Sequence, residues 1–249
     1  MAHSPLDEPR EAAADLPTQD AVSQAATDAG SALGPSDTPS SKRARRSVPN
    51  GAPQLEALPQ GPRWSRDTLR LPAGCPCDLD VGFGRGGSLR HWVEQRAETG
   101  DRALLAVEIK HGCAAAVHAW AAARQATHVS VFQGDVLTLL RHRADDLRFE
   151  RIFVHFPDPW WKARHAKRQV LRDATLPSFW AALQPGGHLY LQTDVEDRAR
   201  TFIALAGALP GASVSQPEHN PYPSVSNREV RATQDGLPIY RVDVAKSAA

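Results

Sequence analysis

The chain has 249 residues, enough for one large α/β domain or for two small ones. Lysine and arginine number 29 against 28 aspartates and glutamates, so the formal net charge is +1. No stretch of 18 apolar residues occurs and the N-terminus lacks an apolar signal segment, so neither a membrane span nor export is expected. The three cysteines are too few for a disulfide scaffold and predict a reducing compartment, the cytoplasm. No cluster of ligand side chains predicts a metal site.

The charge is distributed unevenly along the chain. Residues 1–60 carry five basic against eight acidic side chains, whereas residues 61–249 carry 24 against 20. The first segment is rich in Ala, Ser and Pro and has no aromatic residue, so it cannot bury enough apolar surface to offset its ordering entropy. We therefore predict a disordered arm over residues 1–60 and one folded catalytic domain over residues 61–249. The basic cluster at residues 42–46 is consistent with phosphate contacts, an acidic partner, a nuclear address or a solubilising linker.

From about residue 77, short apolar runs alternate with segments of helical periodicity. In chain order the pattern predicts strand 78–81, helix 89–96, strand 104–107, helix 114–126, strand 129–132, helix 137–143, strand 151–155, helix 176–183, strand 188–193, helix 196–209 and strands 212–215 and 239–244. This alternation is typical of an α/β fold with a doubly wound, mostly parallel seven-stranded sheet and helices on both faces. Such sheets bind ligands at the carboxyl ends of their strands.

The first predicted strand runs into a glycine-rich segment. Gly82, Gly84 and Gly87 fit the pattern G-x-G-x-x-G, whose spacing is shared by nicotinamide and S-adenosylmethionine sites. Asp80 precedes the first glycine by two residues and favours S-adenosylmethionine. A carboxylate there can reach the ammonium group of that cofactor, whereas it would lie unfavourably beside a pyrophosphate. An NAD(P)-dependent oxidoreductase is the alternative, but no hydride-handling site is evident.

Two further acids close the next predicted strands. Glu108 ends the second strand, where a carboxylate can accept hydrogen bonds from both ribose hydroxyls of either cofactor. Asp135 closes the third strand, where an acid or amide commonly meets the adenine amino group. With Asp80, three acids end three successive strands, which favours an adenosine-binding edge over a set of unrelated solvated acids.

The segment after the fourth predicted strand combines prolines, tryptophans and cations. Pro157 and Pro159 restrict the backbone on both sides of Asp158. Trp160 and Trp161 offer broad faces for stacking a base. Aromatic residues beside a dense run of Lys and Arg favour RNA binding, through stacking and phosphate contacts together. The cations that we expect to hold the RNA backbone are Lys162, Arg164, Lys167 and Arg168.

This segment resembles the signature F-P-D-P-W-x-K-x-R-H-x-K-R of the bacterial-type tRNA (guanine-N7)-methyltransferases. The resemblance spans about residues 75–245. The family motif L-E-I-G-F-G is similar to residues 79–84, the motif T-D to Thr193-Asp194, and the late motif S-x-x-E to residues 226–229. The resemblance implies a Rossmann-like class I fold, S-adenosylmethionine as methyl donor, and methylation at N7 of a guanine in the variable loop of tRNA.

The resemblance also implies roles for individual residues. Asp158 is implied as the catalytic residue, lying between cofactor and guanine. Asp80, Gly82, Gly84, Glu108 and Asp135 would complete the cofactor site. RNA contacts, or closure over the pocket, are implied for Lys162, Asp194, Ser226, Asn227, Arg228 and Glu229. The chain departs from the family pattern at Asp80, at Trp161 and at the pair Asn227-Arg228.

Other functions are weighed against this interpretation. The same fold and chemistry could act on another RNA or on a protein side chain, or the fold could serve a weakened or non-catalytic RNA-binding protein. The oxidoreductase alternative leaves the Pro-Asp-Pro-Trp segment unexplained. A monomer, a homodimer and a complex with a partner subunit all stay open.

Overall fold

The computed structural model describes residues 65–69, 71–159 and 163–248, which all belong to the unit Val48–Ala249. The predicted arm over residues 1–60 and its basic cluster lie outside the described residues. Trp160, Trp161 and Lys162, which follow the Pro-Asp-Pro segment, lie outside them as well.

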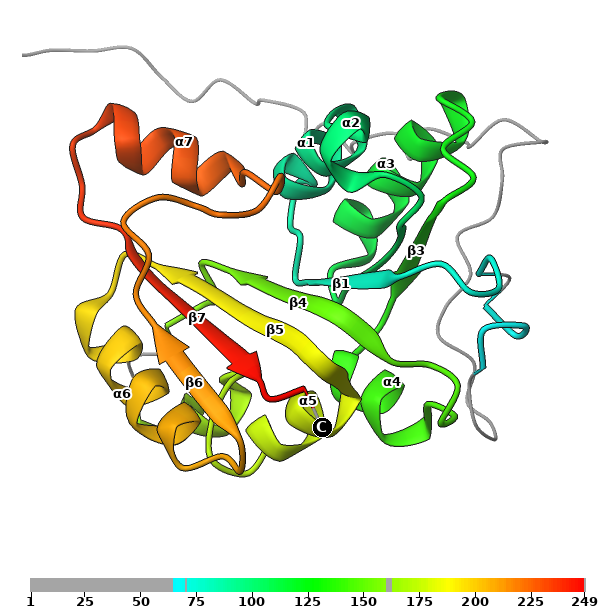
Figure 1. Cartoon of the computed structure of the whole chain (residues 1–249). Coiled ribbons are helices and arrows are strands. Elements are labelled where there is room, and N and C mark those ends of the chain that lie inside the picture. Colours follow the sequence, from blue (N-terminus) through cyan, green and yellow to red (C-terminus); the bar gives the residue numbers. More distant parts are fainter. Residues whose placement is uncertain (1–64, 70, 160–162, 249) are drawn as a thin grey trace, which may run out of the picture. The chain divides into compact units, whose positions relative to one another are not determined.

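The strands of the sheet follow the predicted order along the chain. They are β1 (Cys77–Val81), β2 (Ala103–Glu108), β3 (Val129–Gln133), β4 (Phe149–His155), β5 (Leu183–Thr193), β6 (Ala212–Ser215) and β7 (Tyr240–Lys246). Within the described residues they form one seven-stranded sheet in the order β3-β2-β1-β4-β5-β7-β6 (Figure 1). Strands β1 to β5 pair in parallel, and β7 runs antiparallel between β5 and β6. The predicted Rossmann-like, mostly parallel α/β fold is confirmed.

Helices cover both faces of this sheet (Figure 1). One face carries α1 (Gly87–Glu94) and α3 (His111–Ala123), with the short α2 (Arg96–Thr99) after α1; the other carries α4 (Val136–His142), α5 (Leu176–Ala182) and α6 (Glu196–Gly207). Successive side chains of a strand point to opposite faces. Leu104 and Ala106 therefore pack with α1 and α3, whereas Leu105 and Val107 pack in the other apolar cluster. No described helix is long and apolar enough to cross a membrane.

Two further helices were not predicted, namely α7 (Asn227–Gln234) and the 3-10 helix η1 (Ala163–Arg168). The sequence of α7 carries no apolar stripe that would have predicted a helix, because the helix buries only two of its eight residues. The predicted helix 89–96 is instead divided into α1 and α2. The division occurs at Gln95, whose backbone leaves helical geometry with φ −87° and ψ 47°.

Strand β5 begins at Leu183, well before the predicted start at residue 188. The segment Pro185-Gly186-Gly187 follows the end of α5 as predicted, but it also continues the strand, with an irregular register against β4. A Cβ atom on Gly187 would lie 2.9 Å from the backbone oxygen of Glu150. Glycine is therefore required where β5 passes closest to β4.

A buried ionic cluster supports the sheet near the amino end of β1. The fully buried Asp78 accepts a hydrogen bond of 3.1 Å from the indole Nε1 of Trp92. Its other carboxylate oxygen lies 3.4 Å from Nη1 of Arg102, which also pairs with Glu150. Burial raises the pKa of Asp78 to about 6, although Arg151, Arg102 and the hydrogen bond from Trp92 lower it.

Asp78 should give the free energy of unfolding a pH dependence of defined sign. Between about pH 4 and about pH 6 the folded protein binds more protons at this carboxyl than the unfolded chain, so its contribution to stability falls as pH rises. Denaturant unfolding of wild type and Asp78→Asn should show the wild type losing roughly 2–3 kcal/mol relative to the variant across this window. A difference between the two proteins that does not change with pH would contradict the prediction.

Candidate active site

A cavity of about 880 Å³ opens where the chain order of the sheet reverses, at the carboxyl ends of β1 and β4. Four segments line it: the glycine loop after β1, the end of β4 with the residues that follow it, the residues after β5, and α7 with its cap. The predicted site residues on its wall are Gly82, Gly84, Asp194, Ser226, Asn227 and Arg228. The structure thus brings together motifs that are far apart in the sequence.

The glycine loop leaves room for a ligand beside its backbone. Gly82 and Gly84 have φ angles of +71° and +56°, which glycine adopts without steric cost. A Cβ atom added at either position would meet no other atom within 4 Å. The loop is also held from below, because the backbone N–H of Gly84 donates a hydrogen bond of 2.9 Å to Oε2 of Glu108.

Asp80 lies buried beneath this loop. Its Oδ2 accepts a hydrogen bond of 2.6 Å from the hydroxyl of Ser88, whereas its Oδ1 is buried with no partner among the described residues. Burial raises the pKa of Asp80, although His155 and the Ser88 hydrogen bond lower it. A buried carboxylate oxygen without a partner costs free energy, which a donor from a ligand would recover.

Glu108 is the last residue of β2. Asp135 ends the short loop after the neighbouring strand β3. The carboxylate of Glu108 is 5% exposed and accepts backbone N–H groups at both oxygens, from Gly84 and from Lys110 at 2.8 Å. Each oxygen keeps a second lone pair for a ligand hydroxyl. Asp135 is exposed and caps α4 by accepting a 3.0 Å hydrogen bond from the N–H of Leu137. The three acids end adjacent strands as expected, and their contacts with a cofactor stay a prediction.

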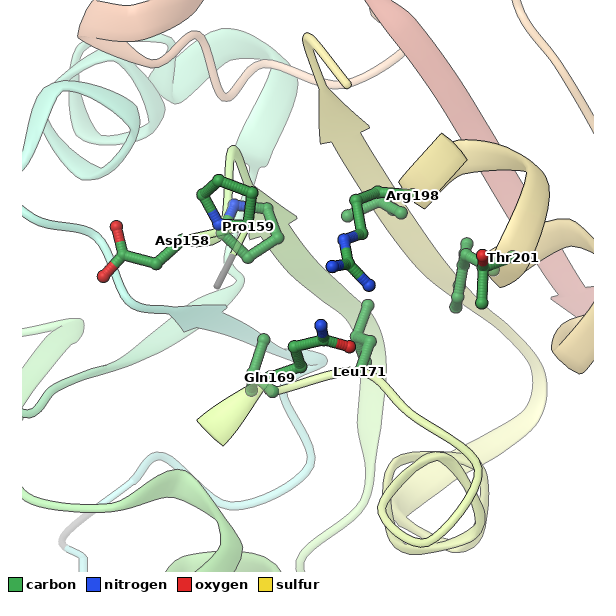
Figure 2. Close-up of a pocket in the computed structure, with 10 residues that line it drawn as sticks. Asp158, Pro159, Gln169, Leu171, Arg198 and Thr201 are labelled. Carbon is green, nitrogen blue, oxygen red and sulfur yellow. The ribbon is translucent and has the colours of Figure 1, made fainter. Parts of the chain in front are cut away.

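Asp158 is exposed between two prolines that both line the main cavity. Asp158 itself does not line that cavity; it borders a second, much smaller pocket of about 30 Å³, together with Arg198 and Thr201 of α6. Figure 2 shows the Asp158 carboxylate directed away from Arg198 and Thr201. The carboxylate is therefore not committed to the small pocket.

The turn into the Pro-Asp-Pro segment is strained. Phe156 has φ +46°, a left-handed conformation that costs a bulky residue about 1–2 kcal/mol. Its backbone N–H donates a hydrogen bond of 2.7 Å to the carbonyl oxygen of Gln192 on β5. This bond helps to hold the conformation that turns the chain out of β4 and across the cavity.

His155, the last residue of β4, lines the cavity although no sequence motif indicated it. Its ring is 8% exposed, with Nδ1 at 2.8 Å from Oε1 of Gln192 and Nε2 at 3.0 Å from the hydroxyl of Ser224. The ring therefore connects β4, β5 and the segment that leads into α7. Its position directly before the Phe-Pro-Asp-Pro motif was the one signal in the sequence that could have revealed it.

Helix α7 closes the cavity on the side of the glycine loop. Ser226 caps the helix by accepting a 3.1 Å hydrogen bond from the N–H of Glu229. A side chain at Gly87 would clash with Asn227, so the helix approaches the loop only because glycine stands there. Arg228 forms an ion pair with Asp194, which follows β5.

Glu229 was expected to take part in RNA contact or closure. The structure buries it and pairs it with Arg241 and Asn220, each at 3.2 Å. It does not belong to the cavity wall. This geometry favours a supporting role for Glu229, which anchors α7 to β7, over direct contact with RNA.

The basic residues after the Pro-Asp-Pro segment lie in η1. Arg164, Lys167 and Arg168 are exposed there. Lys162 lies outside the described residues. None of the three lines the cavity, and their contacts with RNA stay a prediction.

Comparison with known proteins decides the family. Residues 75–242 match the family model described as "Putative methyltransferase". The chain is 31% identical over 183 residues to a tRNA (guanine-N(7)-)-methyltransferase of Synechococcus sp. strain JA-3-3Ab, covering 72% of this chain and 75% of that protein. A tRNA (guanine-N(7)-)-methyltransferase of Rhodopirellula baltica is 30% identical over 221 residues, covering 80% and 78%. The chain belongs to the tRNA (guanine-N7)-methyltransferase family.

Methyltransferases are also found among the solved structures that align with this chain. A SAM-dependent O-methyltransferase from Thermotoga maritima aligns at 18% sequence identity and a TM-score of 0.46, over 74% of this chain and 63% of that chain.

Whether the cofactor occupies the open space beside Gly82 can be tested by comparing Gly82 with Gly74, a glycine of similar backbone geometry outside the cavity. Gly82 and Gly74 have φ angles of +71° and +73°, and a Cβ atom at either would meet nothing within 4 Å, but only Gly82 lines the cavity. Gly82→Ala and Gly74→Ala should each lose roughly 1–2 kcal/mol of stability through backbone strain. Calorimetric titration with S-adenosylmethionine should show weaker binding, by about tenfold or more, for Gly82→Ala alone. Equal affinities for the two variants would show that the loop backbone does not contact the cofactor.

Proposed function

We propose that this chain transfers the methyl group of S-adenosylmethionine to N7 of a guanine in tRNA, giving 7-methylguanosine. One observation carries the proposal: the open glycine loop after β1 lines the same cavity as Pro157 and Pro159, the two prolines that flank Asp158 after β4. Its relatives from Synechococcus and Rhodopirellula, aligned over about three quarters of their lengths, act on guanine N7 of tRNA by name. The family resemblance implies a guanine in the variable loop as the target.

The residues of the loop fit the methyl donor. Oδ1 of Asp80, which is buried and has no partner among the described residues, suits the ammonium group, and the lone pairs left on Glu108 suit the ribose hydroxyls. Asp135 would meet the adenine amino group, and Gly82 and Gly84 leave space for close approach. When bound, S-adenosylmethionine supplies a methyl group activated by a positively charged sulfur.

The reaction requires positioning more than proton transfer. The N7 atom of guanine carries a free lone pair, so no base has to deprotonate it before it attacks the methyl group. Catalysis then rests on orientation and on electrostatic stabilisation of the charge that develops on the base. The Asp158 carboxylate suits both tasks, because it can accept hydrogen bonds from the Watson–Crick edge of guanine and favours the positive charge of the product.

Asp194 offers a second carboxylate at the cavity, but Arg228 engages it in the free protein. Nε of Arg228 lies 3.1 Å from Oδ2 of Asp194, and a second guanidinium nitrogen contacts the same oxygen. Oδ1 of Asp194 receives neither of these bonds. We infer that the substrate guanine meets Asp194 through this oxygen, while Arg228 stays paired or moves to an RNA phosphate.

The proposal includes a cytoplasmic location and leaves the assembly open. Cys75, Cys77 and Cys113 are free thiols, which suits a reducing compartment. A monomer, a homodimer or a complex with a partner subunit would each present the same cavity to tRNA.

Asp158 should be required for methyl transfer. Labelled S-adenosylmethionine and unmodified total tRNA, followed by nucleoside analysis, should give 7-methylguanosine with the wild type. Asp158→Ala should lower the rate by about a hundredfold or more. Asp173→Asn, at an exposed acid outside both pockets, should leave the rate unchanged. A different methylated nucleoside would move the assignment to another substrate. A wild-type rate that follows the titration of one carboxyl would contradict the positioning role.

The basic residues of η1 should contribute to tRNA affinity by charge. Replacing Lys167 and Arg168 with Gln should weaken tRNA binding and reduce the slope of log K against log salt by about 2. Filter binding at several salt concentrations measures both quantities. Arg141→Gln combined with Arg200→Gln, at exposed residues of α4 and α6 outside both pockets, serves as the control of equal charge change. Unchanged affinity at every salt concentration would remove η1 from the RNA interface.

A further inference from the structure

Helices α1 and α3 carry a cationic surface that the cavity does not include. No Asp or Glu occurs between residues 109 and 134, a segment that contains the whole of α3. Arg124 directly follows α3, and Arg90 of α1 lies on the neighbouring helix (Figure 1). Neither arginine lines the cavity described above.

The two arginines meet on one tryptophan. The guanidinium carbon of Arg124 lies 4.5 Å from the ring centre of Trp120, and that of Arg90 lies 5.4 Å from it. Such contacts hold a guanidinium by its flat face and leave its N–H edges available. Helices α1 and α3 pack on one apolar cluster, to which both contribute residues, and Trp120 rests against it. A side chain at Gly86 would clash with Val117, which shows how closely α3 approaches the glycine loop.

Neither guanidinium has an acidic partner within the described part of the chain. Arg102, Arg228 and Arg241 each pair with a carboxylate, whereas Arg90 and Arg124 pair with none. Glu94, one turn further along α1, forms no ion pair with Arg90. Nε of Arg90 is in addition buried without any hydrogen-bond acceptor. Two like charges on one ring, one of them with an unsatisfied buried donor, form an arrangement that a bound anion would stabilise.

The cluster also lies close to the cavity along the chain. Helix α1 begins at Gly87, which lines the cavity, and Arg90 follows three residues later, about one helical turn away. A polynucleotide with one base in the cavity continues on both sides of that base, so its backbone has to cross the rim. The regular spacing of phosphates along such a backbone suits a pair of guanidinium groups held on one ring.

We propose that Arg90, Trp120 and Arg124 form a phosphate-binding cluster that holds the tRNA backbone outside the methylation cavity. The identity of the RNA rests on the proposed function. The cluster contributes to affinity and to the placement of the tRNA, and it takes no part in the chemistry.

The test is a charge-removing double variant, Arg90→Gln with Arg124→Gln. Filter binding of labelled, unmodified tRNA without cofactor should show about tenfold weaker affinity, with a slope of log K against log salt shallower by about 2. In the methylation assay KM for tRNA should rise while kcat stays at the wild-type value. The double Lys variant, which keeps both charges, should retain most of the salt slope.

Three controls keep the outcome interpretable. Arg141→Gln combined with Arg200→Gln removes an equal charge from α4 and α6, on the opposite face of the sheet, and should bind tRNA like the wild type. Affinity for S-adenosylmethionine and the melting temperature establish that the double variant is folded. Arg124→Gln alone, at an exposed residue beyond the end of α3, repeats the test should the double variant unfold.

Wild-type affinity and salt slope in the double variant would overturn the proposal. This is also the result expected if the cluster serves an acidic protein instead of RNA. Equal weakening by Arg141→Gln combined with Arg200→Gln would overturn it too, because the effect would then be one of net charge alone. A wild-type protein that binds tRNA but forms no 7-methylguanosine would count against the proposed function only, since binding is measured without methyl transfer.

Discussion

The two hydrogen bonds of the buried His155 ring hold the active site together. Gln192 on β5 and Ser224 before α7 occupy the two ring nitrogens, so one side chain joins three segments of the cavity wall. Each partner is buried, and a buried polar group that loses its partner costs about 1–3 kcal/mol. The strained turn at Phe156 begins at the next residue and is held to β5 by a backbone bond. The direction of the Pro-Asp-Pro segment therefore depends on this junction, and with it the position of Asp158.

The same junction extends to the helix that closes the cavity. Ser224 stands two residues before Ser226, the cap of α7, and Asn220 binds both the backbone of Ser224 and the carboxylate of Glu229. Arg228 then joins the helix to Asp194 at the end of β5. Opening α7 would expose a buried carboxylate and break an ion pair together, so the helix should move as one unit with the segment before it.

Sequence patterns predicted the parts of this molecule that depend on neighbouring residues. The apolar run of β2 is buried on both faces, and the glycines after β1 adopt positive φ angles, as their composition indicated. Helix α7 was missed because a solvent-facing helix needs no apolar stripe, although Ser226 and Glu229 have the spacing of a capping box. Contacts such as Arg228 with Asp194, 34 residues apart, depend on the tertiary fold and leave no local pattern to read. For the same reason Glu229 was assigned to the substrate, when its buried partner Arg241 is on a strand whose position only the assembled sheet defines.

The distribution of charge explains how a chain with a net charge of only +1 can serve two ligands of opposite sign. Asp80 and Glu108 are buried at the carboxyl ends of adjacent strands, where little solvent screens them, and they suit a cofactor that carries positive charge. The cations lie outside this centre, in exposed η1 and on the paired helices α1 and α3. In the function proposed above, the buried acids hold the cofactor, while the exposed cations attract the RNA that delivers the guanine.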